Sequence, residues 1–278
     1  MGRKRVKDVH VVNKIMPHLM PRRTDAEIYA PIKLDVTNLV KYLAKKNRGR
    51  APDKKITLFH ALVMASAKMI YNRPFMNYYL KARKLYQRDS IRIAFVSRRE
   101  FRDDSDELLI NMAIDDDDTI DTIAGKVVAK VTAARDENNG IDTLLKILTV
   151  LPTPILAAVA GMIKFGDWLG VLPTSFTDAE PDYATLYLAN LGSIKGAAVF
   201  HHLNTFGTNS LFATIGVMHQ EELIIDGKKQ IRDIIDVSVT LDERITDGFR
   251  ALRAFDLIKE CINRPELLDE PVSKEIKL

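Results

Sequence analysis

The stretch Val239-Thr-Leu-Asp-Glu-Arg-Ile-Thr-Asp-Gly248 joins two segments of different hydrophobic periodicity. Before it, Arg232–Leu241 is rich in β-branched residues and predicts a strand. After it, Gly248–Asn263 repeats apolar residues at helical spacing and stops before Pro265, which predicts a helix. The charged residues of the stretch are therefore expected in a short loop between a strand and a helix, where side chains can contribute to a binding or catalytic site.

Further strands are predicted upstream in the same half of the chain. Tyr183–Leu191 and Leu211–Met218 are rich in Val, Ile, Thr and Leu. Asp226-Gly227 lies between two short strand-like runs, 222–225 and 228–230, and this dipeptide favours a two-residue hairpin turn.

The N-terminal half mixes both kinds of element. Apolar spacing and flanking breakers predict strands at Ala26–Asp35, Ile91–Val96 and Leu108–Ile114, and helices at Val36–Lys46, Thr57–Tyr71 and Thr119–Asn138. Several hairpins with few regular βαβ units indicate an α+β sandwich of mixed sheet and helices. We expect residues 1–27 to form an N-terminal arm, irregular over Met1–Pro21, and residues 28–278 to form one domain.

The most apolar region runs from Thr143 to Val171. Lys146, Pro152, Pro154, Lys164 and Asp167 interrupt it, so it contains no run of about 18 apolar residues and a membrane span is not expected. We expect a hydrophobic helical insertion over 143–175, a hairpin of helices that covers a core, lines an acyl pocket, or presents 144–172 to a hydrophobic partner or membrane surface.

Three segments, in order, resemble one family. They are Tyr183-Ala-Thr-Leu-Tyr-Leu-Ala-Asn-Leu-Gly192, Ile225-Asp-Gly-Lys228 and Val239–Gly248, and Pro265-Glu-Leu-Leu268 agrees with them. Together they look like the catalytic domain of the dihydrolipoyl acyltransferases, the core subunits of 2-oxoacid dehydrogenase complexes. That fold is shared with chloramphenicol acetyltransferase. The resemblance extends over most of 28–268 and is strongest after residue 183.

The resemblance implies a homotrimer with active sites between subunits and acyl-coenzyme A as a substrate. In the family, a histidine in a His-x-x-x-Asp-Gly motif removes a proton from a thiol or hydroxyl, which then attacks the thioester. A Ser or Thr hydroxyl donates to the oxyanion, and the motif aspartate pairs with an arginine. This sequence departs twice: Glu243 replaces the histidine, and Ala189 replaces the hydroxyl residue.

The candidate residues follow from that alignment. The family pattern points to Glu243 and Asp247 as catalytic-site residues and to Asn190, Gly192 and Ser193 as coenzyme-binding residues. His202, beside His201, is a candidate relocated base, because in the family this loop approaches the pocket. The alternative for this pair is one solvent-exposed imidazole and one packed imidazole.

Two functions remain open at this stage. Glutamate titrates near 4.3 and a thiol near 8.5, a gap of about 4 units that makes the proton transfer about 100-fold slower than with imidazole unless burial raises the carboxyl pKa. Loss of the oxyanion hydroxyl costs a further factor of about 100 to 1,000. The protein is therefore expected to be either an acyltransferase with a non-standard base or a catalytically lapsed trimeric scaffold or binding protein.

The composition bears on the cellular location and on the kinds of partner that this protein has. The single cysteine, Cys261, excludes an internal disulfide, fits a reducing, cytoplasmic location and is expected to be buried and inert. The net charge of +4 is mild, and the basic residues near the start lack interleaved aromatic residues, so nucleic-acid binding is not expected. Only 27 residues precede the matched region, so we expect a stand-alone protein without lipoyl domains.

No metal site is expected. Asp115–Asp118 is a run of four carboxylates, which raises the alternative of a cation site. However, adjacent side chains of an extended strand end cannot all face one ion, whereas acidic residues at a helix start interact favourably with the helix dipole. No other set of His, Cys or carboxylate residues has closing ligand spacing.

Overall fold

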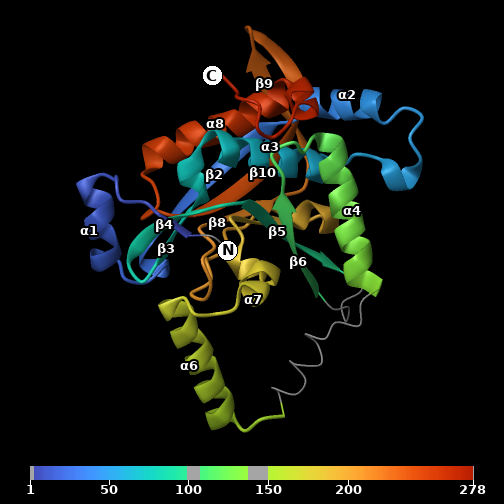
Figure 1. Cartoon of the computed structure of the whole chain (residues 1–278). Helices are drawn as coiled ribbons and strands as arrows, with labels where there is room; N and C mark the ends of the chain where they lie inside the picture. The colour runs from blue at the N-terminus through green and yellow to red at the C-terminus, as the bar shows by residue number, and fades with distance from the viewer. Residues whose placement is uncertain (1–2, 99–106, 137–149, 278) are drawn as a thin grey trace.

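The computed structural model describes residues 3–98, 107–136 and 150–277 (Figure 1). Its centre is a seven-stranded mixed sheet with the order β2-β10-β8-β7-β5-β6, and β9 pairs with β10 beyond that path. The strands are β2 (Glu27–Asp35), β5 (Ile91–Arg98), β6 (Glu107–Ile114), β7 (Leu186–Asn190), β8 (Leu211–Ile215), β9 (His219–Ile225) and β10 (Lys228–Asp242). β5, β7 and β8 run parallel, and the other neighbours are antiparallel.

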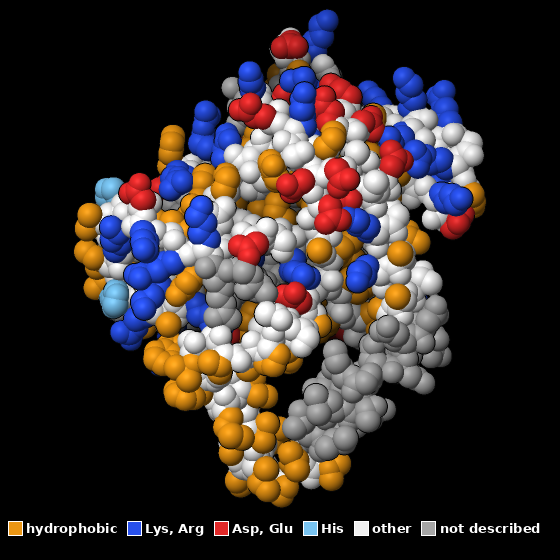
Figure 2. Space-filling view, viewed as in Figure 1, with side chains coloured by type: hydrophobic (Ala, Val, Ile, Leu, Met, Phe, Trp, Pro, Cys, Tyr) orange, Lys and Arg blue, Asp and Glu red, His pale blue; other side chains and the backbone are white. Residues whose placement is uncertain are grey.

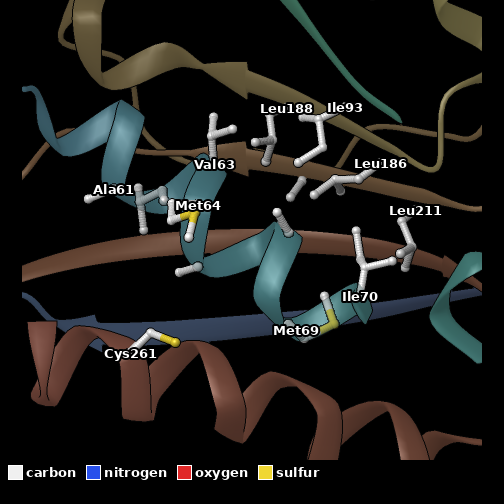
Figure 3. Close-up of a cluster of buried hydrophobic side chains, with 14 of the residues drawn as sticks. Ala61, Val63, Met64, Met69, Ile70, Ile93, Leu186, Leu188, Leu211 and Cys261 are labelled. Atoms are coloured by element: carbon white, nitrogen blue, oxygen red, sulfur yellow. The ribbon is translucent and has the colours of Figure 1, made fainter. Parts of the chain in front are cut away.

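Four helices pack on one face of this sheet. They are α2 (Thr37–Lys46), α3 (Leu58–Asn72), α4 (Ile120–Asp136) and α8 (Gly248–Asn263). α3 packs against both the sheet and α8, so Val63 lies near the strand residue Leu188 while Cys261 of α8 lies on the other side of α3 (Figure 3). The predicted α+β sandwich is confirmed, and Cys261 is buried as expected.

The opposite face of the sheet carries a smaller apolar cluster. Side chains alternate along a strand, so Leu186 and Leu188 of β7 enter the main core while Tyr187 and Ala189 face the other way. There they join Phe212 of β8. No helix among the described residues belongs to this cluster, and the segment 195–210 crosses the face instead, which leaves room for a cavity.

The N-terminal region is more regular than expected. The prediction of an irregular Met1–Pro21 is wrong, because β1 (Arg3–Arg5) pairs with β4 (Lys84–Arg88) and α1 spans Val11–Leu19. His10 caps α1 by accepting the Val12 N–H, a local signal that the interior Pro17 obscured.

The partner of β4 is β3 (Tyr78–Lys81), and sequence analysis missed this hairpin. Its turn residues, Ala82 and Arg83, both have positive φ values, of 45° and 60°. Such turns usually contain Gly, Asn or Asp, so the sequence gives no turn signal here. In contrast, the predicted Asp226-Gly227 turn is confirmed, with φ values of 51° and 74°.

The apolar insertion is helical where it is described. α6 (Thr153–Leu169) is followed by the short helix α7 (Thr174–Ala179), and residues 143–149 of the expected helical hairpin lie outside the described residues. α6 extends away from the body of the molecule (Figure 1). Within the described ranges, no helix is both long enough and apolar enough to cross a bilayer. The division at residue 28 stays a prediction.

Candidate functional site

A cavity of about 630 Å³ opens at one end of the sheet, lined by strand residues of both faces and by Phe59 of α3 and Val127 and Val131 of α4. We call it the sheet-face cavity. Strand side chains form its floor, the segment after β7 closes one end, and the segment 201–204 forms a wall. Its polar and aromatic lining residues are Phe59, Phe95, Ser97, Glu107, Glu180, Asp182, Tyr187, Asn190, Ser193, His201, His202, Asn204 and Phe212.

The two imidazoles of the cavity belong to a stack of four rings. His201 lies between His202 and Phe212, with ring centroids 4.6 and 4.2 Å away, and Phe212 in turn stacks on Tyr187 at 4.8 Å. The His201 Nδ1 lies 2.7 Å from the His202 carbonyl oxygen. A carbonyl only accepts, so in the neutral ring Nδ1 carries the proton and Nε2 keeps its lone pair.

The segment that carries these histidines is held at both ends. The Thr214 hydroxyl on β8 donates to the Val199 carbonyl oxygen. Farther along, the Leu203 N–H donates to Glu27 Oε1 at 2.7 Å, and Glu27 is the first residue of β2. The rings are therefore fixed on the sheet rather than carried by a free loop.

Two carboxyl groups of the cavity were not predicted. Burial raises the pKa of both Glu180 and Asp182. Asp182 also accepts a hydrogen bond from the Asn204 side chain at 2.6 Å, which opposes that rise. The only signal in the sequence was an acidic pair directly before a predicted strand, which is also the composition of an ordinary loop.

Asn190 and Ser193, predicted to bind coenzyme, line one end of the cavity. The Ser193 hydroxyl donates to the Asn190 carbonyl oxygen at 2.7 Å. Ala189, which stands where the family pattern has a hydroxyl residue, also lines the cavity. Gly192 has a packing reason of its own, because a Cβ there would lie 2.5 Å from the Gly216 carbonyl oxygen.

Glu243 does not line this cavity. It follows β10, and its N–H donates to the Ala26 carbonyl oxygen at 2.8 Å. In the sheet, Asn190 pairs with Ile215 while the Asp242 N–H donates to Ser210, so the two residues mark opposite ends of β8. At about 3.3 Å per residue, those ends are about 16 Å apart. Within one copy of the chain, Glu243 and Asn190 are therefore far apart, although the sequence pattern assigned both to one site.

The residues on either side of Glu243 have structural roles. Arg244 pairs with Asp242 through two contacts, and both side chains are buried. Asp247 is exposed and accepts the Arg250 N–H at 2.8 Å, which caps α8. The arginine pair implied for Asp247 is therefore absent among the described residues. A helix that begins directly after Asp247 favours a capping carboxylate at this position.

Two of the four aspartates at 115–118, Asp115 and Asp118, have side-chain partners near the start of α4. Lys126 pairs with both Asp115 and Asp118, and the Thr122 hydroxyl donates to Asp118 at 2.8 Å. In the part of the chain that the structure describes, no group of three or more His, Cys, Asp or Glu residues is arranged to hold a metal ion.

Comparisons with known proteins agree with this architecture. Residues 174–269 match the family described as 2-oxoacid dehydrogenases acyltransferase (catalytic domain). The dihydrolipoyllysine-residue acetyltransferase component of the pyruvate dehydrogenase complex of Mycoplasma capricolum is 34% identical over 92 residues. That alignment covers 33% of this chain and 20% of the relative, so the similarity spans about one fifth of the relative's length.

Two solved structures share the fold over nearly the whole chain. A probable dihydrolipoamide acetyltransferase from Listeria monocytogenes superposes with a TM-score of 0.60 at 16% identity, covering 99% of this chain and 98% of its own. A chloramphenicol acetyltransferase gives 0.52 at 10% identity, covering 94% and 100%. The resemblance to the acyltransferase catalytic domain and the chloramphenicol acetyltransferase-like fold are both confirmed.

Proposed function

We propose, starting from the 2-oxoacid dehydrogenase acyltransferase match at residues 174–269, that this protein transfers acyl groups from coenzyme A thioesters to a thiol or hydroxyl acceptor. One observation carries the proposal. The sheet-face cavity combines an oriented imidazole at His201 with the polar end formed by Asn190 and Ser193, in a volume of about 630 Å³.

The base in this proposal is an imidazole of the cavity, His201 or its neighbour His202. An ordinary imidazole titrates about 2 units below a thiol and an ordinary glutamate about 4 units below it. The difference of about 2 units corresponds to about 2.7 kcal/mol, or a factor of about 100 in rate if it appears fully in the transition state. The imidazole therefore outperforms a carboxylate base at the same distance.

Glu243 then acts from a neighbouring copy of the chain, in a homotrimer. Two features support this arrangement: Glu243 lies about 16 Å along the strands from the Asn190 end of its own cavity, and Ile194, Val199 and Phe200 expose large apolar side chains near that cavity. A carboxylate at the mouth of a partner's cavity would orient an imidazole and stabilise its protonated form, as in catalytic triads.

The protein is placed in the cytoplasm under this proposal. A buried free thiol at Cys261 is stable in a reducing compartment, where intracellular coenzyme A thioesters are also formed.

The test is coenzyme A release from acetyl- and longer acyl-coenzyme A with a dithiol acceptor. We expect His201→Gln or His202→Gln to lower the rate about 100-fold and Glu243→Gln to lower it about 10-fold or more. His219→Gln and Glu222→Gln, on the β9 hairpin, are the matched controls and should leave the rate unchanged. Turnover unaffected by all three site variants would contradict the proposal.

A second candidate is a lapsed acyltransferase that keeps the fold as a binding protein or scaffold. Ala189 favours it, because this residue lines the cavity without a hydroxyl for the oxyanion. Calorimetry with coenzyme A separates the two functions. Binding without any thiol release from acyl-coenzyme A would support the lapsed site, and a Ser193→Ala variant would identify the polar end of the cavity as the binding point.

A further inference from the structure

α6 presents an apolar surface that nothing in the described chain covers. None of its side chains is fully buried, and seven large apolar residues are at least one-third exposed: Ile155, Leu156, Met162, Ile163, Phe165, Trp168 and Leu169. We call these residues the α6 surface. The space-filling view shows them as a continuous apolar projection below the body of the molecule (Figure 2).

The apolar side chains wrap most of the helix. At 3.6 residues per turn, the α6 surface extends over about 240° of the circumference. The remaining polar stripe faces the body, where Asp167 accepts hydrogen bonds from Lys81 at 2.9 Å and from the Tyr183 hydroxyl at 2.6 Å. A helix that is apolar on nearly all sides is typical of a position surrounded by other apolar groups rather than of a solvent-facing one.

Basic side chains border this surface. Arg22, Arg83 and Lys164 line a cavity of about 390 Å³ together with Trp168, and Arg83 also borders a second hollow with Arg5 and Lys14. We call these five cations the basic cluster. None of them makes an ion pair with another described residue, whereas Lys81 and Arg244 of the same region are paired. Figure 2 shows Lys and Arg side chains gathered between α1 and α6.

We propose that the α6 surface and the basic cluster bind the surface of a bilayer that contains anionic lipid. Apolar side chains that enter the acyl boundary beside unpaired Lys and Arg residues are the combination that interfacial helices use. α6 is about 25 Å long at 1.5 Å per residue, which is shorter than the hydrocarbon core of about 30 Å. The helix therefore lies in the interface and does not span the bilayer.

Lipid fits this surface better than a second copy of the chain. A protein groove covers one side of a helix, whereas acyl chains and headgroups can surround a helix that is apolar over about 240°. A two-fold contact centred on Phe165 and Trp168 would also bring two basic clusters together, with mutual repulsion. Anionic headgroups supply the opposite charge instead. This inference does not depend on acyl transfer.

Trp168 is the single tryptophan of the chain and reports directly on the proposal. We use phosphatidylcholine vesicles that contain about 30% of the anionic lipid phosphatidylglycerol. With these vesicles we expect a blue shift of the Trp168 emission, and quenching of that emission when the lipids carry brominated acyl chains. The protein should co-sediment with these vesicles, and high salt should weaken binding about 10-fold or more because it screens the basic cluster.

Two variants and their controls make the test decisive. Phe165→Asp should abolish co-sedimentation, whereas Ile224→Asp, at a still more exposed apolar residue of β9, should not. The double variant R22Q/K164Q should lose the preference for anionic vesicles, whereas K229Q should keep it. The proposal would be overturned if the protein did not bind vesicles, or if it bound neutral vesicles equally well and without salt dependence. It would also be overturned if the blue shift appeared without vesicles and followed protein concentration as the chain dimerised.

Discussion

Arg244 and Asp242 form a two-point ion pair within a tight turn, with Nε 2.8 Å from Oδ1 and Nη2 2.7 Å from Oδ2. Both side chains are more than nine-tenths buried. Arg244 also donates to the Met20 carbonyl oxygen at 2.9 Å, which ties the end of β10 to the segment after α1. The Asp242–Arg244 ion pair therefore holds the backbone on both sides of Glu243 in place.

Replacing Arg244 by Met should strongly destabilise the protein. The change leaves the Asp242 carboxylate buried without its partner, which costs about 3–5 kcal/mol in the free energy of unfolding. Urea unfolding followed by circular dichroism measures this. The exposed pair Lys229–Glu222 supplies the control, since Lys229→Met should change stability by less than about 1 kcal/mol. A loss at Arg244 as small as at Lys229 would show that the turn does not depend on the pair.

Introducing a hydroxyl at Ala189 should raise the rate of acyl transfer. Ala189 lines the sheet-face cavity, so Ala189→Ser places a donor beside the reacting carbonyl. Removal of one such donor from other enzymes costs about 100-fold or more, and we expect a gain of about 10-fold because the cavity was not built around this group. Steady-state coenzyme A release checks it, with Ala189→Gly as the control that adds no donor. Equal rates for Ser and Gly variants would contradict an oxyanion role for this position.

Acid should destabilise the fold through His60. Its Nδ1 accepts the Thr57 N–H at 3.1 Å in the capping box of α3, and burial lowers its pKa from 6.5 to about 4. As the pH falls below 6.5, the unfolded imidazole binds a proton that the folded one does not bind until about 4. The contribution of neutral His60 is thus complete above pH 6.5 and is lost between 6.5 and 4, by about 3 kcal/mol.

The measurement is the free energy of unfolding at several pH values in that window. His60→Gln is the comparison, because glutamine can complete the capping box without titrating. The difference in stability between the two proteins should shift by about 3 kcal/mol in favour of the variant at pH 4. Parallel curves for both proteins would show that His60 does not titrate as described.

Cys261 should be unreactive in the folded protein. It is fully buried beneath α3, and burial raises its pKa to about 12. Only the thiolate reacts with disulfide reagents, so a thiol assay at pH 8 should detect no reaction in the native state and one thiol per chain in denaturant. Rapid native labelling would mean that α8 opens readily from the core.

The fold was predictable from local patterns to a large extent. The apolar spacing in α3, the Asp226-Gly227 turn and the motif at 239–248 each specify their element without help from distant residues. The β3–β4 hairpin was not predictable, because Ala82 and Arg83 adopt left-handed conformations that only the surrounding structure stabilises. α1 was not predicted, because a proline within a short segment argues against a helix, yet Pro17 lies in the last turn of α1.

The site was predictable only in part. Asn190, Ser193 and His202, which the family pattern named, line one cavity, and their roles stay a prediction. The sequence pattern could not show that Glu243 lies outside this cavity, because the position of Glu243 depends on the antiparallel pairing of β8 with β10. Glu180 was overlooked for a similar reason, since its meaning comes from burial beside residues far away in the chain.

The pairing of β10 with β2 has a consequence for how the chain is made. Asp35 pairs with Ile234, about 200 residues later, and β10 also supplies the partner of β8 and β9. During synthesis, β2 cannot pair with β10 until residues 228–242 have left the ribosome. A nascent chain halted before residue 228 has no middle strand, and its open hydrogen-bonding edges make it a natural client for chaperones.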